Sequence, residues 1–255
     1  MRVSTRDIAA VSTMAAMQVV LSYIPGIPVV GVDGAKIGIV SSVVPLFGLL
    51  LGPWLGFASA FMGSTVSRVL TGANAFTWLT LPAMPLSAFV AGCLSRRSVG
   101  VLKGWTVSAF TLGGLILAWY ATRMGGTVLL YPLLHWAGLA IILIFREAIS
   151  FFFHRGSRAE FTLSTGLCGF VSVMVAHMYG TLAFLFAAEF AFINAPLVPE
   201  FFTALVPVVA AERLALTFIM TVLGVPIILS LRGRPSFTQP LVANMADQPP
   251  DTAPA

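Results

Sequence analysis

Apolar runs of membrane-spanning length recur along this chain from Asp7 nearly to Leu231, and no water-soluble core could contain them. Hydrophobic residues make up 58% of the 255 residues and charged residues only 9%, and the mean hydropathy is +0.96. These values lie far outside the range of soluble domains. We therefore expect an all-α fold, a polytopic integral membrane helical bundle that forms one domain over residues 1–234.

Charges, Pro/Gly clusters and polar dipeptides divide the bundle into about eight candidate spans. We place these spans at residues 7–24, 37–52, 53–71, 76–95, 103–122, 127–146, 163–193 and 205–231. The first span has no small-residue cleavage site after it, so we interpret it as a retained helix and not as a signal peptide. Residues 235–255 are rich in Pro, Ala, Asp and Gln without apolar periodicity, which predicts a disordered cytoplasmic tail.

The basic residues predict the orientation of these spans. If the N-terminus is cytoplasmic, ten basic residues fall on the inner side and three, Lys36, Arg68 and Arg123, fall on the outer side. This is the bias that the positive-inside rule describes, and an even number of spans then places both termini in the cytoplasm. We expect a multi-pass protein of the cell (plasma) membrane. The net charge of +5 needs no nucleic-acid partner, because the basic residues form no stripe interleaved with exposed aromatics.

The segment VPLFGLLLGPWLGFASAFMG, from Val44 to Gly63, carries two prolines and four glycines in an almost wholly apolar stretch. The span that ends at Leu51 has only fifteen residues, about 22 Å of helix against a hydrocarbon core of about 30 Å. Gly52-Pro53 ends this helix and starts the next, so we expect a tight hairpin. Its glycines either allow close helix packing or frame a cavity lined by broken helices.

On this topology the polar residues within and beside the spans gather on the outer side, where they predict a pocket for a small molecule. The residues that we expect to contact a ligand are Lys36, Asn74, Trp78, His135, Glu189, Asn194 and Glu212. Tyr131 and Trp136 lie near His135, although these two and Trp78 could instead form an interfacial aromatic belt.

Three other polar groups have competing interpretations. Glu212 and Arg213 are adjacent and point about 100° apart on a helix, so we expect one of them to pair with another helix. His177 lies in the middle of a span and is interpreted as a hydrogen-bonded packing residue. Arg146 and Glu147 are interpreted as part of a solvated cytoplasmic loop or as a docking surface for a cytoplasmic partner.

Several motifs are missing from the sequence. It has no G-x-x-x-x-G-K-[ST] loop, so the chain cannot power transport by its own nucleotide hydrolysis. It has no H-E-x-x-H or G-x-S-x-G motif, and its three histidines are too scattered for a convincing metal site. Cys93 and Cys168 fall inside apolar segments and are expected to be buried. We therefore expect no enzymatic activity, no cofactor and no metal.

Four stretches together resemble the substrate-binding membrane subunit, or S-component, of energy-coupling factor (ECF) vitamin transporters. They are TRDIAAVSTMAAMQVVLS, PGIPVVGVDGAKIGI, the hairpin VPLFGLLLGPWLGFASAFMG and VPVVAAERLALTFIMTVLGVPIILSL. The most distinctive piece is the hairpin pattern P-x6-G-P-x2-G with a further glycine seven residues on. The resemblance covers about the first 95 and the last 65 residues.

The resemblance implies that the chain captures a vitamin or related nutrient at the outer face and delivers it through a transmembrane coupling subunit and two cytoplasmic ATPases. The family's first helix carries an A-x-x-x-A-like face that packs on the coupling subunit, and the matching positions here are Ala9, Ser12 and Ala16, with Thr13 beside them. The family has six helices, so the resemblance implies a six-helix core plus an extra helix pair at about residues 103–146.

The sequence is also compatible with two alternatives to a substrate-capture subunit. The chain could be a stand-alone secondary transporter coupled to protons through Glu189 or Glu212, although it shows no clear inverted repeats. It could also be a membrane scaffold without a ligand, in which case its polar residues should pair among themselves.

Overall fold

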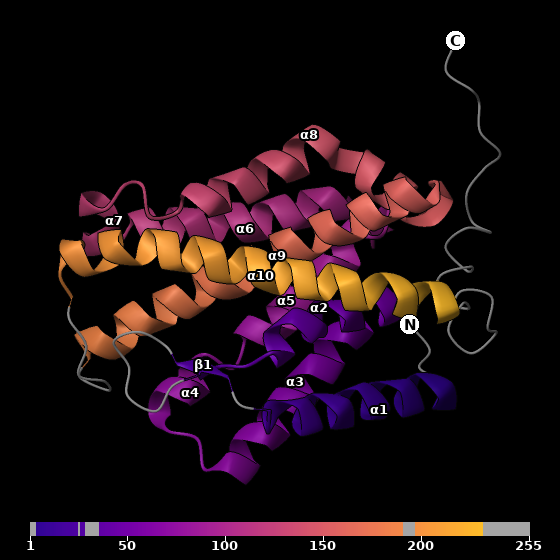
Figure 1. The fold of residues 1–255 in the computed structure, drawn as a ribbon, viewed down its shortest axis with the longest axis horizontal. Helices are drawn as coiled ribbons and strands as arrows, with labels where there is room; N and C mark the ends of the chain where they lie inside the picture. Colours follow the sequence, from indigo (N-terminus) through magenta and orange to yellow (C-terminus); the bar gives the residue numbers. More distant parts are fainter. Residues whose placement is uncertain (1–3, 25, 29–35, 191–196, 232–255) are drawn as a thin grey trace.

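The computed structural model describes residues 4–24, 26–28, 36–190 and 197–231, and it confirms an all-α membrane protein (Figure 1). The predicted tail at 235–255 lies outside these residues. The helices are α1 (Thr5–Ser22), α2 (Val40–Leu51), α3 (Pro53–Thr71), α4 (Ala75–Leu79), α5 (Ala83–Leu94), α6 (Gly104–Tyr120), α7 (Arg123–Thr127), α8 (Leu133–Arg155), α9 (Arg158–Glu189) and α10 (Pro199–Leu231). Two short antiparallel ladders pair β1 (Ile27–Pro28) with β2 (Lys36–Ile37) and β3 (Ser98–Val99) with β4 (Leu102–Lys103).

Local chemistry sets several of these helix ends. α1 and α9 each begin with a capping box, in which Ser4 and Ser157 exchange hydrogen bonds with the residue three positions later. α3 begins at Pro53, which needs no backbone donor at that position, and ends at Thr71, after which Gly72 caps the helix in the left-handed conformation. Gly52 joins α2 to α3 with a φ of 83°, which a residue with a Cβ rarely adopts.

Within the described residues, four helical stretches are long and apolar enough to cross a membrane, namely 75–94, 133–155, 158–189 and 199–231. α2 is apolar but has only twelve residues, in keeping with the short second span. The loop expected at Arg146 is absent. The helix instead kinks at this residue, which has a φ of 35° and a ψ of −115°, and continues to Arg155, because the turn to α9 is made at Gly156 and Ser157.

The core of the bundle surrounds α2, which buries eleven of its twelve residues. A Cβ added at Gly48 would lie 1.8 Å from the carbonyl oxygen of Ala88 in α5, and one added at Gly92 would lie 2.5 Å from the nitrogen of Pro53. Gly56 faces Gly48 in the same way, with 2.6 Å to its Cα. The glycines of the hairpin therefore serve close helix packing, one of the two interpretations left open by the sequence.

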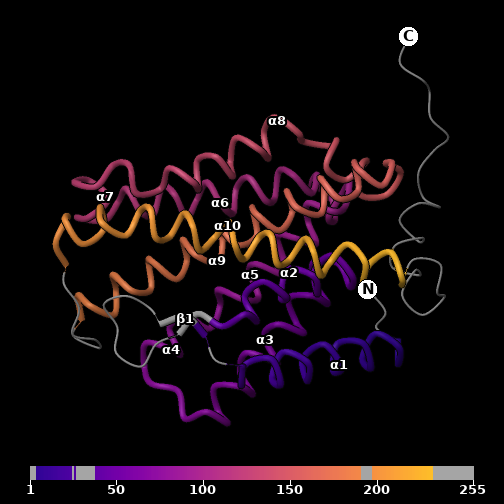
Figure 2. Tube along the Cα trace, in the orientation of Figure 1, coloured from indigo at the N-terminus to yellow at the C-terminus, as the bar shows by residue number. Residues whose placement is uncertain are grey.

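The helices are arranged around this core in layers (Figures 1 and 2). α1 packs on α3 at one side of the bundle, and α6 packs on α8 at the opposite side. α9 contacts α5, α8 and α10 and so joins the two sides. α1 begins and α10 ends at the same end of the molecule, while α4 and α7 lie at the other end.

Candidate functional site

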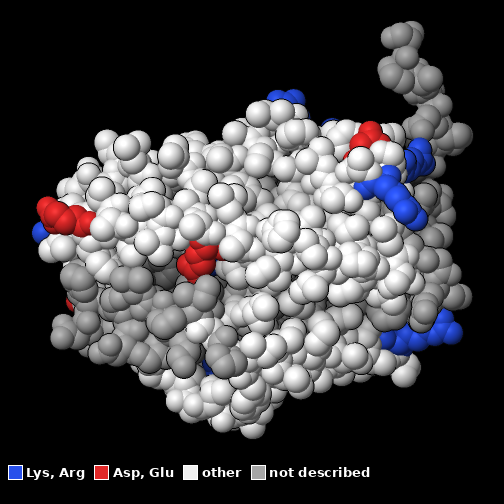
Figure 3. All heavy atoms as spheres, viewed as in Figure 1, with Lys and Arg blue, Asp and Glu red and all other residues white. Residues whose placement is uncertain are grey.

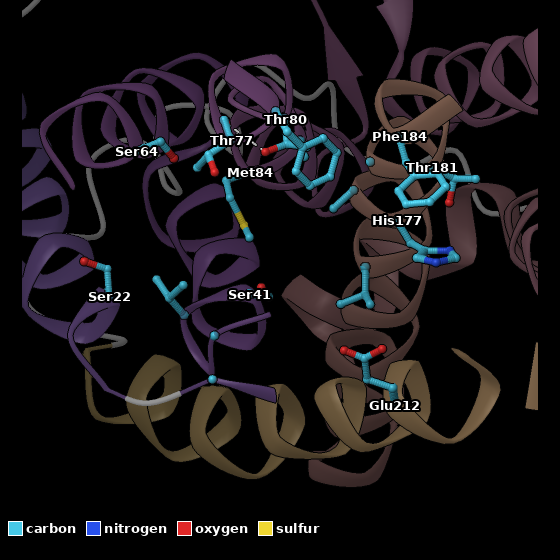
Figure 4. Close-up of a pocket in the computed structure, with 18 of the residues that line it drawn as sticks. Ser22, Ser41, Ser64, Thr77, Thr80, Met84, His177, Thr181, Phe184 and Glu212 are labelled. Atoms are coloured by element: carbon cyan, nitrogen blue, oxygen red, sulfur yellow. Dashed lines mark hydrogen bonds between the residues drawn. The ribbon is translucent and has the colours of Figure 1, made fainter. Parts of the chain in front are cut away.

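A cavity of about 930 Å³ is lined in part by residues of α4 and of the segments next to it. Figure 1 shows α4 at the end of the bundle opposite the start of α1. The cavity walls come from the end of α1, the start of α2, the second half of α3, α4 with its flanking residues, the middle of α9 and the first half of α10. Figure 4 shows Glu212, His177 and Phe184 on one side of the cavity, with Ser64 and Thr77 across from them. The cavity therefore lies between the two sides of the bundle.

Hydrogen bonds fix the polar wall formed by α1, α3 and α4. The guanidinium of Arg68 donates from Nε to the carbonyl of Thr77 at 2.8 Å and from Nη1 to the carbonyl of Ser64 at 3.1 Å, which ties α4 to α3. Gln18 of α1 donates from Nε2 to the Ser64 hydroxyl at 2.7 Å. The Oε1 atom of Gln18 is buried and has no partner among the described residues. Asn74 caps α4 by accepting from the backbone N–H and the hydroxyl of Thr77.

The opposite wall is aromatic. Phe184 of α9 stacks on Phe201 of α10 with ring centroids 6.1 Å apart, and it meets Phe202 edge-on. Tyr131, in the loop before α8, also meets Phe202 edge-on at 5.6 Å. All four rings line the cavity, so a planar apolar group inside it would find ring faces and edges to pack against.

A buried charge pair lies where this aromatic wall meets α10. Arg213 is only 5% exposed, and its Nη2 atom donates to Oε2 of Glu212 at 3.2 Å. Oε1 of Glu212 and Nε of Arg213 have no partner among the described residues, and both side chains line the cavity. The prediction that one of the two pairs with another helix was wrong, because the two neighbours pair with each other. Ionisable groups at such a depth are costly and mark functional sites.

Two hydrogen bonds join α8 and its preceding loop to α9. Nε2 of His135 lies 3.0 Å from Nδ1 of His177, and the hydroxyl of Tyr131 lies 3.1 Å from that of Thr181. His177 and Thr181 line the cavity, whereas His135 is 1% exposed and lies behind them. The interpretation of His177 as hydrogen-bonded is therefore correct, but the residue also lines the cavity.

The residues predicted to contact a ligand fall into three groups. Asn74 and Glu212 line the cavity. Trp78 is 41% exposed, Glu189 is an exposed residue at the end of α9, and neither lines the cavity; His135 lies behind it. The backbone of Lys36 pairs with Pro28 in the short ladder, and Asn194 lies outside the described residues.

Sequence reasoning missed much of the lining because it considered charged and aromatic residues singly. The missed signal is helical spacing of the residues that face the cavity. In α3 the lining residues are Ser64, Ser67, Arg68 and Thr71, and in α9 they are Val173, Ala176, His177, Gly180, Thr181 and Phe184. Both sets recur every three or four residues, which is one face of a helix.

The positions on α1 matched to a partner contact all lie on its outer face. Ala9, Ser12, Thr13 and Ala16 are exposed, while the opposite face of α1 buries Met14 and Gln18 against the bundle. Among the described residues α1 packs mainly on α3, which leaves this face of small residues exposed.

Metal-binding chemistry is not evident at the cavity. The part of the chain that the structure describes contains no group of three or more His, Cys, Asp and Glu residues placed to hold a metal ion. Cys93 and Cys168 are buried, as their apolar segments predicted.

Comparison with known proteins gives a family match and one relative. The family model of the ECF-type riboflavin transporter, S component, matches residues 2–136. This continuous range includes α6, α7, Tyr131 and His135. The chain is 31% identical over 191 residues to an uncharacterized protein, MJ0923, of Methanocaldococcus jannaschii; the alignment covers 74% of this chain and 58% of that protein. No solved structure matches.

Proposed function

Because the chain belongs to the family of ECF-type riboflavin transporter S components, we propose that it is the substrate-capture subunit of a vitamin importer and that its ligand is riboflavin. In this proposal the ligand binds in the cavity from the outer face, and a separate coupling subunit with two ATPases delivers it. The chain itself catalyses no reaction.

The observation that carries this proposal is the cavity. Its volume of about 930 Å³ lies at the upper end of the roughly 300–1,000 Å³ of small-molecule sites. Its walls combine aromatic rings with buried polar groups, and atoms such as Glu212 Oε1 lack partners among the described residues. A flavin has matching chemistry, since it joins a flat ring system to imide and hydroxyl groups.

Among the residues predicted to contact the ligand, we propose Glu212 and Asn74 as direct contacts because both line the cavity. Glu212 is the stronger candidate, since Asn74 is already engaged by Thr77. Contacts from Lys36 and Asn194 stay predictions.

We further propose that the exposed small residues of α1, Ala9, Ser12 and Ala16, form the contact with the coupling subunit. Figure 3 shows most Lys and Arg atoms of the visible face at the end where the chain begins. By the positive-inside rule this end would be cytoplasmic, with both termini there and the cavity facing outward from the plasma membrane.

The alternatives make different demands on the site. A scaffold without a ligand would need its polar residues paired among themselves, and Glu212 Oε1 and Arg213 Nε, which have no partner in the described part of the chain, argue against it. A proton-coupled carrier would need a titratable group in the cavity, and Glu212 meets this condition whereas Glu189 does not.

Two measurements test the proposal. The tagged protein is purified from its native membrane in mild detergent, and mass spectrometry identifies bound proteins and retained small molecules; we expect a coupling subunit, ATPases and a flavin. Riboflavin is also titrated into the purified protein while its fluorescence is recorded. Absence of both partners and flavin binding would overturn the proposal, and uptake that responds to the proton gradient but not to ATP depletion would favour the carrier.

A further inference from the structure

The sequence predicted the helix pair α6–α8 as an addition to a six-helix core, yet the loop between these helices contributes one ring to the cavity. Tyr131, in the loop before α8, is one of the rings that line the cavity. Behind it, Trp119 of α6 is fully buried and stacks on Tyr131 with centroids 4.6 Å apart and an interplanar angle of 24°. The position of Tyr131 is therefore set by α6 on one side and by its hydrogen bond to Thr181 on the other.

His135 extends this wall by one turn. It is 1% exposed, so its ring cannot reach the ligand space itself. Its Nε2 atom lies 3.0 Å from Nδ1 of His177, and the planes of the two rings are nearly parallel, with centroids 5.1 Å apart and an interplanar angle of 16°. An imidazole has two nitrogens, and this contact uses one of those in His177. Only Nε2 of His177 is then left for a group in the cavity.

We propose that the α6–α8 pair forms a wall of the ligand site and that His135 is a positioning residue, which fixes the ring of His177 so that its Nε2 meets the ligand. A single neutral ring nitrogen is suited to an uncharged hydrogen-bonding group, such as an imide, a ring carbonyl or a hydroxyl. This inference deepens the proposed function and rests on it, because it assumes that the cavity holds the transported molecule.

The test is a double-mutant cycle read by riboflavin affinity, with fluorescence titrations of the wild type, His135→Leu, His177→Leu and the double variant. We expect each single variant to bind about tenfold more weakly, which is roughly one hydrogen bond. If His135 acts through His177, the double variant binds no more weakly than His177→Leu. His135→Gln, whose amide nitrogen takes the place of the ring Nε2, should restore affinity to within about threefold of the wild type.

Tyr120→Phe provides a matched control within the same helix pair. The Tyr120 hydroxyl accepts from Trp136 at 3.1 Å and donates to Leu129, but Tyr120 does not line the cavity, so its loss should leave affinity unchanged. The unfolding temperature of every variant is recorded in the same detergent.

Three results would overturn the inference. Losses of affinity that add in the double variant would show that His135 does not act through His177. A lower unfolding temperature of His135→Leu with unchanged affinity would assign His135 a structural role only. A wild-type protein that binds no riboflavin would overturn the proposed ligand and this inference with it, which separates that failure from the other two.

Discussion

Around Gly48 the helices α2, α3 and α5 meet backbone to backbone, whereas around Glu212 the helices leave a cavity of about 930 Å³. The first region has no room for a Cβ, and the second holds buried polar atoms without partners among the described residues. Both regions lie in the same apolar bundle, so an apolar environment alone does not explain why one is closely packed and the other contains a cavity.

The side chains explain it. Gly48, Gly56 and Gly92 remove every atom that would keep the helices apart, so the centre gains packing contacts. In the cavity region the facing residues are rings and polar groups, such as Phe184, His177 and Arg213, which cannot close onto one another without burying unpaired polar atoms. Close helix packing and ligand space thus depend on different residue types. Substitutions in the two regions should therefore affect stability and ligand binding differently.

The largest effect is expected at the packed centre. Gly48→Val places side-chain atoms where even a Cβ would lie 1.8 Å from the Ala88 carbonyl, which is backbone and cannot move aside. We expect almost no folded protein in detergent extracts, measured by size-exclusion chromatography. Gly113→Ala in α6 is the control, because no atom of the described residues lies within 4 Å of that added Cβ, and it should be neutral or stabilising by up to about 1 kcal/mol.

The next effect is expected at the charge pair. Glu212→Leu leaves the buried guanidinium of Arg213 without its partner and should lower the free energy of unfolding by about 3 kcal/mol. The double variant Glu212→Leu/Arg213→Met should recover most of this stability but not riboflavin binding, measured by thermal unfolding and fluorescence titration. A double variant that binds normally would remove the pair from the ligand site.

A smaller effect is expected at the α4 cap. Asn74→Ala removes the acceptor for the Thr77 N–H and should cost about 1 kcal/mol, while Asn74→Ser keeps a cap and should cost less. If the Asn74 amide also contacts the ligand, Asn74→Ser keeps its stability but loses affinity. Equal unfolding temperatures for all three proteins would contradict the capping role.

The smallest effect on stability is expected at the outer face of α1. Ala16 is exposed, so Ala16→Leu should change the free energy of unfolding by less than about 0.5 kcal/mol. The larger side chain should nevertheless reduce the recovery of the coupling subunit in co-purification. Phe218→Leu on α10, which is also exposed, serves as the control and should leave recovery unchanged.

The sequence predicted the fold class, the hairpin and the order of the helical segments, because apolar run length and Gly-Pro punctuation are local signals. It failed at Arg146, where it predicted a loop. Regular helix geometry is interrupted at Arg146, but the helix resumes directly and continues to Arg155, so the adjacent charges Arg146 and Glu147 mark a kink and not a loop. The Arg146 side chain lies over the ring of Trp105 at 5.6 Å and donates from Nε to the Leu143 carbonyl.

The site was predicted less completely than the fold. Glu212 and Asn74 were selected because a charge or an amide beside an apolar span is unusual, and both line the cavity, while their contact with a ligand stays a prediction. Pairings such as Gln18 with Ser64 and His135 with His177 join residues 46 and 42 positions apart, and single-sequence periodicity carries no information about contacts at that separation.

α1 connects two parts of the molecule that were described separately. Its outer face presents Ala16, while Gln18 and Ser22, less than two turns further along, line the cavity. If that face binds the coupling subunit, only the width of α1 separates this subunit from the cavity. A tilt of α1 driven by that subunit would then displace one wall of the cavity directly, without a relay through the rest of the bundle.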